Sequence, residues 1–355
     1  MTFVCALVEL SQVCFPSHPI RPHRPNTGNL PVRLGVVVYR LCTKPLKKLL
    51  PPLVMLASLS ATLHAQTVDD AIMIPKKTLF TGALYSHDTW NQYWEGPLER
   101  TNGNLGTVKT QSVSWTGNYG ITDRLDVLVT VPYVWTHASQ GVLHSMHGFQ
   151  DFALGAKYNF LDRPFTEAGR IRAFAVVAGG IPMTGYTPDF QPLSIGLGAK
   201  RIAARGTLNF QSNRGWFLTG STAYTWRDNV TLNRNSYFTE GQLFLTNQVQ
   251  MPNVFDYVVS GGWFRRGLML QGLFFQQRTQ GGGDIRRQDM PFISNMMNLS
   301  RVSGMVMYPI PGPLHNLAYQ FTYGYVVDGR NVGQSTTITT GFDYTVHFAK
   351  RGPKR

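Results

Sequence analysis

Residues Thr337–Phe348 read TITTGFDYTVHF and alternate between two kinds of side chain. Apolar, aromatic and β-branched side chains share one face, at Ile338, Thr340, Phe342, Tyr344, Val346 and Phe348. Small and polar side chains share the other face, at Thr339, Gly341, Asp343, Thr345 and His347. Period-two alternation of this kind predicts a half-buried β-strand. An apolar face opposite a polar one suits a transmembrane strand with lipid outside and water inside.

The end of this stretch also resembles the C-terminal signal by which the barrel-assembly machinery recognises bacterial outer-membrane barrels. The matching positions are Gly341, Tyr344, Val346 and Phe348. The chain departs from that signal in its tail, Ala349–Arg355, because the signal usually ends the chain. We expect this stretch to be the closing strand of a barrel, paired with a strand at residues 76–87.

Residues 44–65 have the features of a secretory signal peptide. Lys44, Lys47 and Lys48 precede an apolar run at 49–63, and Leu63-His64-Ala65 is a plausible cleavage site. A transmembrane anchor is disfavoured because the run is shorter than about 20 residues and contains two prolines. Residues 1–43 are expected to be a non-native or disordered upstream extension, and residues 66–355 to be the barrel. All three cysteines precede residue 65, which excludes a disulfide scaffold.

After residue 66 the sequence predicts an all-β fold, a single antiparallel transmembrane β-barrel of the outer-membrane type with about 12 strands. Long connections alternate with short ones, as extracellular loops alternate with periplasmic turns. Both termini are therefore expected in the periplasm. Strands are expected at 76–87, 106–118, 124–136, 149–161, 170–182, 194–210, 216–227, 250–264, 268–279, 295–308, 317–328 and 335–348.

One segment carries a family resemblance. Residues Gly117–Tyr133 read GNYGITDRLDVLVTVPY, and a Gly-x-x-Asp strand follows at Gly148–Asp151. With the final hairpin, Tyr323–Tyr344, these segments resemble the outer-membrane family named "MetA-pathway of phenol degradation", whose members are described as transporters. The chain departs from the family pattern at Gln150, where glycine is expected. The resemblance implies a bacterial outer-membrane barrel for uptake of small hydrophobic or aromatic compounds.

A 12-stranded barrel has a lumen narrower than that of the water-filled 16-stranded porins. The expected role is therefore passive passage, selective or not, of small hydrophobic or aromatic compounds. Pro132, inside a predicted strand, indicates a bulge or strand end. Polar side chains with inward parity are the candidates to line the lumen: Asp126, Thr130, Asp151, Lys157, Asn159, Gln320, Asp343 and His347.

Two other classes of function stay open at this stage. Outer-membrane lipid hydrolases use a His-x-Ser pair, which His137 and Ser139 match, with Asp151 as a candidate orienting acid. Against catalysis, His137 and Ser139 share the lipid-facing parity, whereas Asp151 has lumen parity. A structural or adhesion barrel would act through the long loops at 88–105 and 228–249. A soluble periplasmic β protein is the remaining alternative fold.

The expected partners are outer-membrane lipids, the barrel-assembly machinery and a small hydrophobic solute. Six of the 14 net positive charges lie in residues 1–65, so residues 66–355 carry a net charge of +8. No zinc finger or basic helix accompanies this excess, which disfavours nucleic acid and favours a basic lumen or rim. No cofactor fingerprint follows a strand. His144 and His147 have metal-ligand spacing without an evident third ligand, so no metal site is expected.

Overall fold

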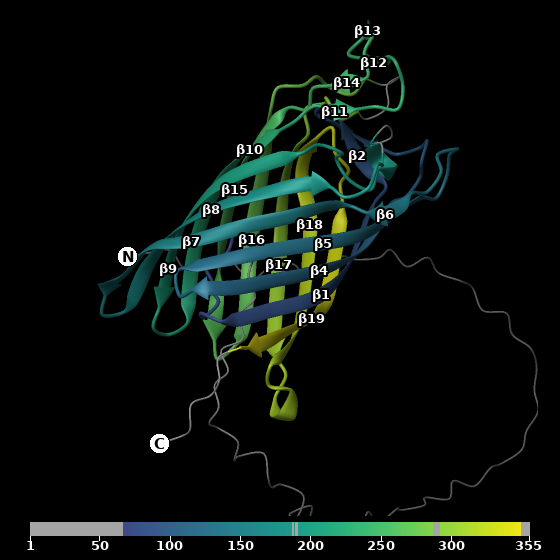
Figure 1. Ribbon diagram of the computed structural model, residues 1–355. Helices are drawn as coiled ribbons and strands as arrows, with labels where there is room; N and C mark the ends of the chain where they lie inside the picture. The colour runs from purple at the N-terminus through teal and green to yellow at the C-terminus, as the bar shows by residue number, and fades with distance from the viewer. Residues whose placement is uncertain (1–66, 187, 189–190, 287–291, 349–355) are drawn as a thin grey trace, which may run out of the picture. The chain divides into compact units, whose positions relative to one another are not determined.

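The computed structural model describes residues 67–186, 188, 191–286 and 292–348, all of which belong to one compact unit (Figure 1). Twelve long strands form one antiparallel sheet that closes on itself as a barrel. These strands are β1 (Thr78–Trp90), β4 (Val108–Thr122), β5 (Leu125–Ala138), β7 (Asp151–Thr166), β8 (Gly169–Pro182), β9 (Arg201–Ser212), β10 (Trp216–Arg227), β15 (Asn253–Arg265), β16 (Leu268–Gln280), β17 (Asn298–Pro309), β18 (Leu317–Arg330) and β19 (Thr336–His347).

The barrel closes between its first and last long strands, as the sequence predicts. β1 pairs with β19 from Thr78 opposite His347 to Thr89 opposite Thr336, and with β4 on its other side. Each of the twelve strands pairs with its neighbour in the chain, so no crossover is needed. The predicted signal peptide, its upstream extension and the tail after Phe348 lie outside the described residues.

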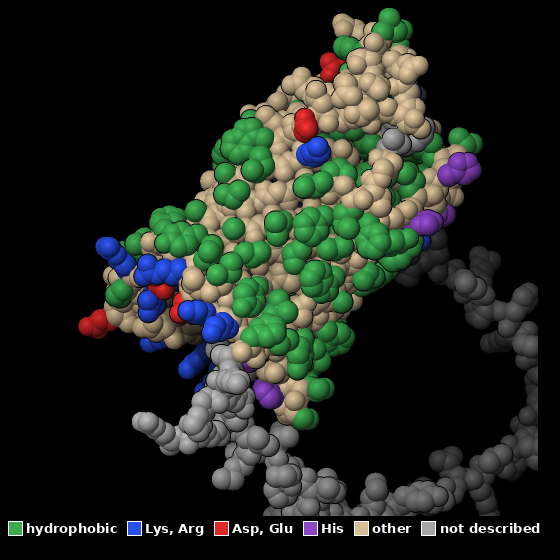
Figure 2. Space-filling model, viewed as in Figure 1, with side chains coloured by type: hydrophobic (Ala, Val, Ile, Leu, Met, Phe, Trp, Pro, Cys, Tyr) green, Lys and Arg blue, Asp and Glu red, His purple; other side chains and the backbone are tan. Residues whose placement is uncertain are grey.

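The outer and inner faces of the barrel have opposite chemistry. Large apolar side chains stand exposed on the outer wall, and Figure 2 shows them spread over it. On β7, for example, Leu154, Tyr158 and Phe160 are exposed, whereas Asp151, Lys157 and Asn159 are buried on the inner face. A soluble protein buries its apolar face, so this inverted pattern indicates a wall that faces lipid. The barrel is therefore of the outer-membrane type, and a soluble β protein is excluded.

Connection lengths differ between the two ends of the barrel. One end has long loops that carry the short strands β2 (Gln92–Glu95), β3 (Leu98–Thr101), β6 (His147–Phe149), β11 (Val230–Thr231), β12 (Tyr237–Thr239), β13 (Gln242–Phe244) and β14 (Gln248–Val249) and the 3-10 turn η1 (Gln191–Leu193). The other end has tight turns, the longest of which contains η2 (Gly312–Leu314). Long loops face the outside in this class of barrel, and short turns face the periplasm. No helix within the described ranges is long and apolar enough to span a membrane.

One predicted strand start and one predicted irregularity differ clearly from the structure. The strand expected at 194–210 begins at Arg201, because Leu193, Ile195 and Ala199 are buried in the preceding loop. Their alternation imitates a strand, yet they pack within the extracellular loops. The irregularity expected at Pro132 lies on the neighbouring strand instead. Pro132 stays inside β5, and Gln150, which separates β6 from β7, donates its backbone N–H to the Pro132 carbonyl at 2.9 Å.

Candidate functional site

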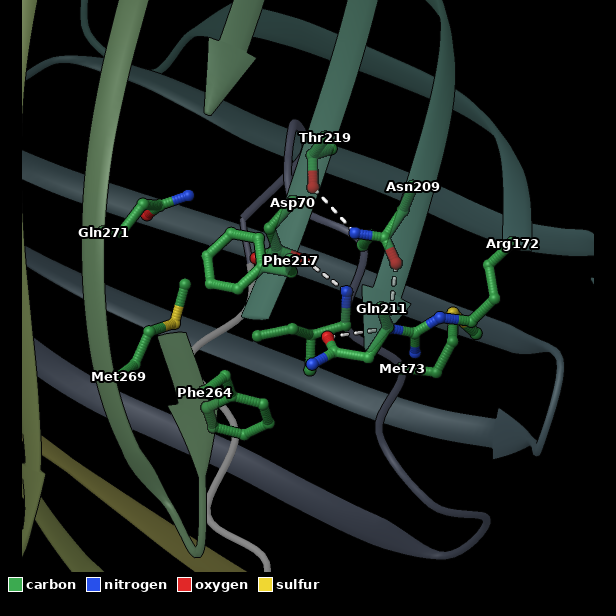
Figure 3. A pocket seen from close by; sticks show the side chains of 12 residues that line it. Asp70, Met73, Arg172, Asn209, Gln211, Phe217, Thr219, Phe264, Met269 and Gln271 are labelled. Carbon is green, nitrogen blue, oxygen red and sulfur yellow. Dashed lines mark hydrogen bonds between the residues drawn. The ribbon is translucent and has the colours of Figure 1, made fainter. Parts of the chain in front are cut away.

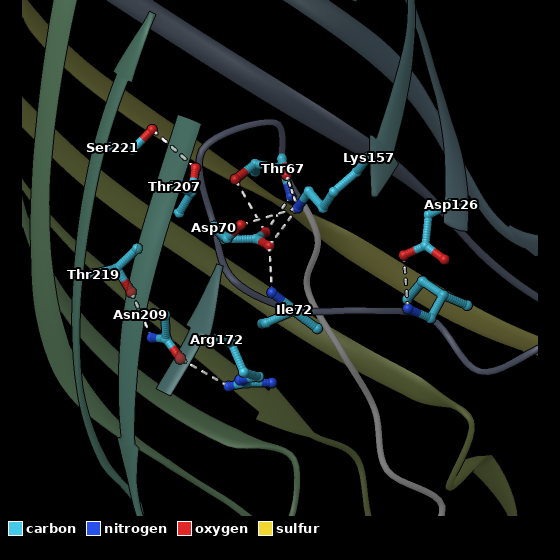
Figure 4. Close-up of polar contacts among 11 residues, drawn as sticks. Thr67, Asp70, Ile72, Asp126, Lys157, Arg172, Thr207, Asn209, Thr219 and Ser221 are labelled. Atoms are coloured by element: carbon cyan, nitrogen blue, oxygen red, sulfur yellow. Dashed lines mark hydrogen bonds and ion pairs between the residues drawn. The ribbon is translucent and has the colours of Figure 1, made fainter. Parts of the chain in front are cut away.

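Residues 67–77, which we call the N-terminal segment, run from the lumen, where residues 70–74 are mostly buried, to the periplasmic rim, where residues 75–77 are exposed (Figure 4). Lys157 on β7 holds this segment with its side-chain ammonium, which is fully buried. Its Nζ donates to the Asp70 carboxylate at 2.8 Å, to the Asp70 carbonyl at 3.1 Å and to the Thr67 carbonyl (Figure 4). The Asp70 carboxylate also accepts the Ile72 N–H at 2.8 Å. A buried charge pair with this many hydrogen bonds fixes the segment firmly.

A second set of contacts holds the segment where it enters the lumen from the periplasmic end. The Asp126 carboxylate on β5 accepts the Ile74 N–H at 2.9 Å. Lys77 donates its N–H to the Gly120 carbonyl on β4, and its own carbonyl accepts the Phe348 N–H. Gly120 allows this close approach, because a Cβ there would lie 2.4 Å from the carbonyl oxygens of Ile74 and Pro75.

Apolar side chains also pack against the N-terminal segment. Ile72 and Ile74 are buried, and they form one cluster with lumen-facing side chains from four strands, namely Phe80, Met269, Met307 and Ala318. Burying an aliphatic side chain of this size stabilises a structure by roughly 1.5–3 kcal/mol. The segment is therefore held by apolar packing as well as by charge.

Cavities flank the N-terminal segment on both sides. One of about 230 Å³ lies beside Thr67, Asp69 and Asp70 and is walled by the adjoining strands β15 to β19, β1 and β4. Its lining is mixed, with apolar Phe80, Leu84, Leu273 and Met305 beside polar Ser260, Gln320, Thr322 and Asp343. A second cavity, of about 110 Å³, lies against Asp70–Met73 and the walls of β8, β9 and β10 (Figure 3).

Ion pairs follow the inner wall from the extracellular end toward the middle. Arg201 on β9 contacts Asp151 on β7, and Tyr186 from the loop after β8 donates its hydroxyl to the same carboxylate. Burial and the Asp151 carboxylate raise the pKa of Tyr186 above its usual value, so its hydroxyl keeps its proton. Arg205 pairs with Asp256 on β15 at 2.6 Å. Both aspartates are buried and both arginines are mostly buried. In each pair the arginine compensates the charge of the aspartate.

The extracellular loops pack into their own apolar clusters. One cluster joins Leu105, Val108 and Leu193. Another brings together side chains from the loops after β8, β10 and β16: Ala199, Val230, Leu232, Val249, Met251, Phe292 and Ile293. These loops are therefore folded structures with cores of their own.

The predicted lumen-lining residues fall into three groups. Asp126, Asp151, Lys157, Asn159 and Asp343 are buried on the inner face, and the first three hold the contacts given above. Thr130 is half-buried on β5, and Gln320 lines the 230 Å³ cavity. His347 is exposed at the end of β19, where its Nδ1 lies 3.1 Å from the Thr78 hydroxyl.

The structure does not assemble the catalytic group that the His-x-Ser spacing suggests. The Ser139 hydroxyl accepts the Thr107 N–H at 2.8 Å, and His137 Nδ1 lies 3.1 Å from the Ser145 hydroxyl. Asp151 is buried in the lumen with Arg201 and Tyr186. No set of three or more potential metal ligands is brought together in the described part of the chain. His147 instead contacts the Tyr133 hydroxyl at 3.0 Å.

Sequence reasoning missed the N-terminal segment and the arginines of the inner wall. Arg201, Arg205, Asn209 and Gln211 share one parity on β9, which the polar alternation of that strand could have revealed. Asp70 gives no such signal, because it lies in a segment without strand periodicity.

A family profile described as "Putative MetA-pathway of phenol degradation" matches residues 100–342. The chain belongs to this family. The match covers ten of the twelve long strands completely and β19 in part, so the resemblance read from the Gly117–Tyr133 segment is confirmed. No curated protein matches the family member described here.

Several solved structures are similar to this family member. The COG4313 outer membrane channel from Pseudomonas putida F1 has a TM-score of 0.60 at 13% identity, over 77% of this chain and 97% of that one. The NanC porin has a TM-score of 0.40 at 7% identity, over 74% and 98%. A variant of the TodX monoaromatic hydrocarbon channel has a TM-score of 0.40 at 9% identity, over 78% and 91%.

Proposed function

We propose that the barrel gives small hydrophobic or aromatic compounds a passive route across the outer membrane, and that it is not an enzyme. The observation that carries this proposal is the mixed chemistry of the lumen. Phe80, Leu84, Met269, Leu273 and Met305 give a 230 Å³ cavity apolar surface, beside polar side chains such as Ser260 and Gln320. A water-filled pore for hydrophilic solutes has no need of such a surface, whereas an apolar solute gains free energy by contacting it.

Two further findings support a route of this kind. The family profile that matches the chain is named for phenol degradation. The barrel from Pseudomonas putida F1, which shares this fold over 97% of its length, is described as an outer membrane channel. The N-terminal segment lies across the route, so solutes pass through the cavities beside it or when it moves.

Uptake of radiolabelled toluene by intact Gram-negative cells tests the proposal. Cells that produce the wild-type barrel should take up toluene several-fold faster than cells with an empty vector. Ser260→Trp should abolish the gain, because Ser260 lines the 230 Å³ cavity and a large ring would fill it. Gly220→Trp is the matched control, since Gly220 lies on the exposed outer face with open space around a built Cβ.

Folded barrel in the outer membrane is quantified in every strain by its heat-modifiable mobility on gels. Equal toluene uptake with and without folded wild-type barrel would rule out the proposed route and favour a structural barrel.

A further inference from the structure

The 110 Å³ cavity beside the N-terminal segment combines an arginine with aromatic and thioether side chains (Figure 3). Ala71, Ile72 and Met73 form one side, and side chains from β8, β9, β10, β15 and β16 form the other. Arg172, Gln211 and Phe264 also line an opening of about 400 Å³ at the periplasmic end, together with Asp162 and Arg170. The cavity therefore adjoins the periplasmic rim of the lumen.

Arg172 gives the cavity a cation with unused hydrogen-bonding capacity. Its Nη2 donates to the Asn209 amide oxygen at 3.0 Å and to the Gln211 amide oxygen at 3.5 Å. Its Nε is buried and has no hydrogen-bond partner among the described residues. A guanidinium has five N–H donors in a planar fork that fits a carboxylate. A buried donor left unpaired is costly, and a bound anion would supply the missing hydrogen bond.

Neither carboxylate near this arginine is free to neutralise it, because Asp162 pairs with Arg170 at 2.9 Å and Asp70 pairs with Lys157 at 2.8 Å. Asp70 is the one acidic residue that lines the cavity, and its carboxylate is held by Lys157 at 2.8 Å and by the Ile72 N–H. The pair formed by Asp70 and Lys157 is neutral overall. The cavity therefore has a net positive charge, which comes from Arg172.

The remainder of the cavity is suited to a ring. Phe217 and Phe264 supply two aromatic faces, and Met73 and Met269 supply thioethers, which pack well against aromatic rings. A cavity of about 150 Å³ with apolar walls accommodates benzene. The 110 Å³ cavity, continued by the adjoining opening of about 400 Å³, has room for one ring and a small substituent.

We propose that this cavity binds single-ring aromatic carboxylates, with the carboxylate on Arg172 and the ring between Phe217 and Phe264. The inference rests on the proposed function, because it names a class of solute for the same lumen. It also specifies that the solute has a carboxylate in addition to an aromatic ring. The N-terminal segment forms part of the site, so a bound solute contacts both the wall and the segment.

Benzoate binding to the full-length protein in lipid nanodiscs, measured by isothermal titration calorimetry, tests the site directly. Benzoate should bind at least about tenfold more tightly than benzyl alcohol, which has the ring without the charge, and than acetate, which has the charge without the ring. Arg172→Gln should weaken benzoate binding about tenfold. Arg214→Gln is the matched control, since Arg214 is exposed in the turn between β9 and β10 and does not line the cavity.

Equal binding of benzoate and acetate would overturn the aromatic part of the inference. Equal binding of benzoate by the wild type and the Arg172→Gln variant would overturn the role of the arginine. Toluene uptake by cells with the wild-type barrel separates these failures from a failure of the route itself, because toluene has no carboxylate for Arg172 to bind. Absence of toluene uptake in the wild type would contradict the proposed route, whatever the result of the benzoate titration.

Discussion

The ammonium of Lys157, fully buried on β7, lies 2.8 Å from the carboxylate of Asp70, 87 residues earlier in the chain. This ion pair joins the wall of the barrel to the N-terminal segment inside it. Each charge would be costly without the other, because neither is exposed to bulk water. The position of the segment in the lumen therefore depends on both residues.

Lys157→Met should release the N-terminal segment, because it leaves Asp70 buried without its counter-ion, at a cost of about 3–5 kcal/mol. A cysteine placed at Ala71, which is 5% exposed, reports the release through the rate of its reaction with a hydrophilic maleimide. Labelling should be slow in the wild-type background and fast with Lys157→Met. Adding Asp70→Leu should slow the labelling again, since the buried charge is then gone, and continued fast labelling would contradict this account.

Gly120→Ala should displace the same segment without changing any charge. A Cβ at Gly120 would lie 2.4 Å from two carbonyl oxygens of the segment, so the segment must shift. We expect faster labelling of the cysteine at Ala71. Gly304→Ala is the control, because nothing lies within 4 Å of a Cβ built there. Similar labelling in the two variants would show that the contact at Gly120 does not position the segment.

The loop after β16 should be sensitive to acid. Hydrogen bonds from Arg330, at 2.5 and 2.7 Å, hold the pKa of Asp284 below its usual value. A depressed pKa in the folded state means that the contact stabilises the loop above about pH 4 and is lost as the pH falls through the folded pKa. The effect is small, because both groups are partly exposed. In an NMR titration the midpoint of Asp284 should rise in Arg330→Gln, and an unchanged midpoint would exclude Arg330 as the cause.

Phe348→Asp should reduce assembly of the barrel. Phe348 is 58% exposed on the lipid-facing side, its ring contacts Tyr119, and its N–H donates to Lys77 across the closing seam. A charge there opposes membrane insertion. The fraction of heat-modifiable barrel in outer-membrane preparations measures the effect. Deletion of residues 349–355 should leave that fraction unchanged, whereas normal assembly of Phe348→Asp would contradict the role given to this strand end.

Ser139→Ala should leave phospholipid and lipid A hydrolysis at the background level of the wild type. The Ser139 hydroxyl accepts a backbone hydrogen bond from Thr107, and His137 contacts Ser145 instead. Radiolabelled lipid incubated with purified protein provides the measurement. A serine-dependent release of fatty acid would restore the hydrolase alternative and remove the proposal that the barrel is not an enzyme.

Strand positions follow from the sequence because the membrane imposes one chemistry on each face. β10 lies at the predicted 216–227, since Leu218, Tyr224 and Trp226 alternate with Thr219, Ser221 and Thr225. The inward direction of Lys157 is predictable in the same way, because a lysine that faced lipid from this strand would be costly. Its partner is not predictable. Asp70 belongs to a segment without periodicity, and nothing in the sequence relates it to a strand 87 residues later.

The anchorage of Lys77 determines how far the N-terminal segment can travel. Its backbone bonds to Gly120 and Phe348 attach it to both neighbours of β1, and its φ of 59° turns the chain inward there. The ten residues from Thr67 to Lys76 span at most about 35 Å when fully extended from this anchor. Loss of the contacts to Lys157 and Asp126 would therefore free the segment while every strand keeps its partners, and a barrel of fixed circumference would then have a wider lumen.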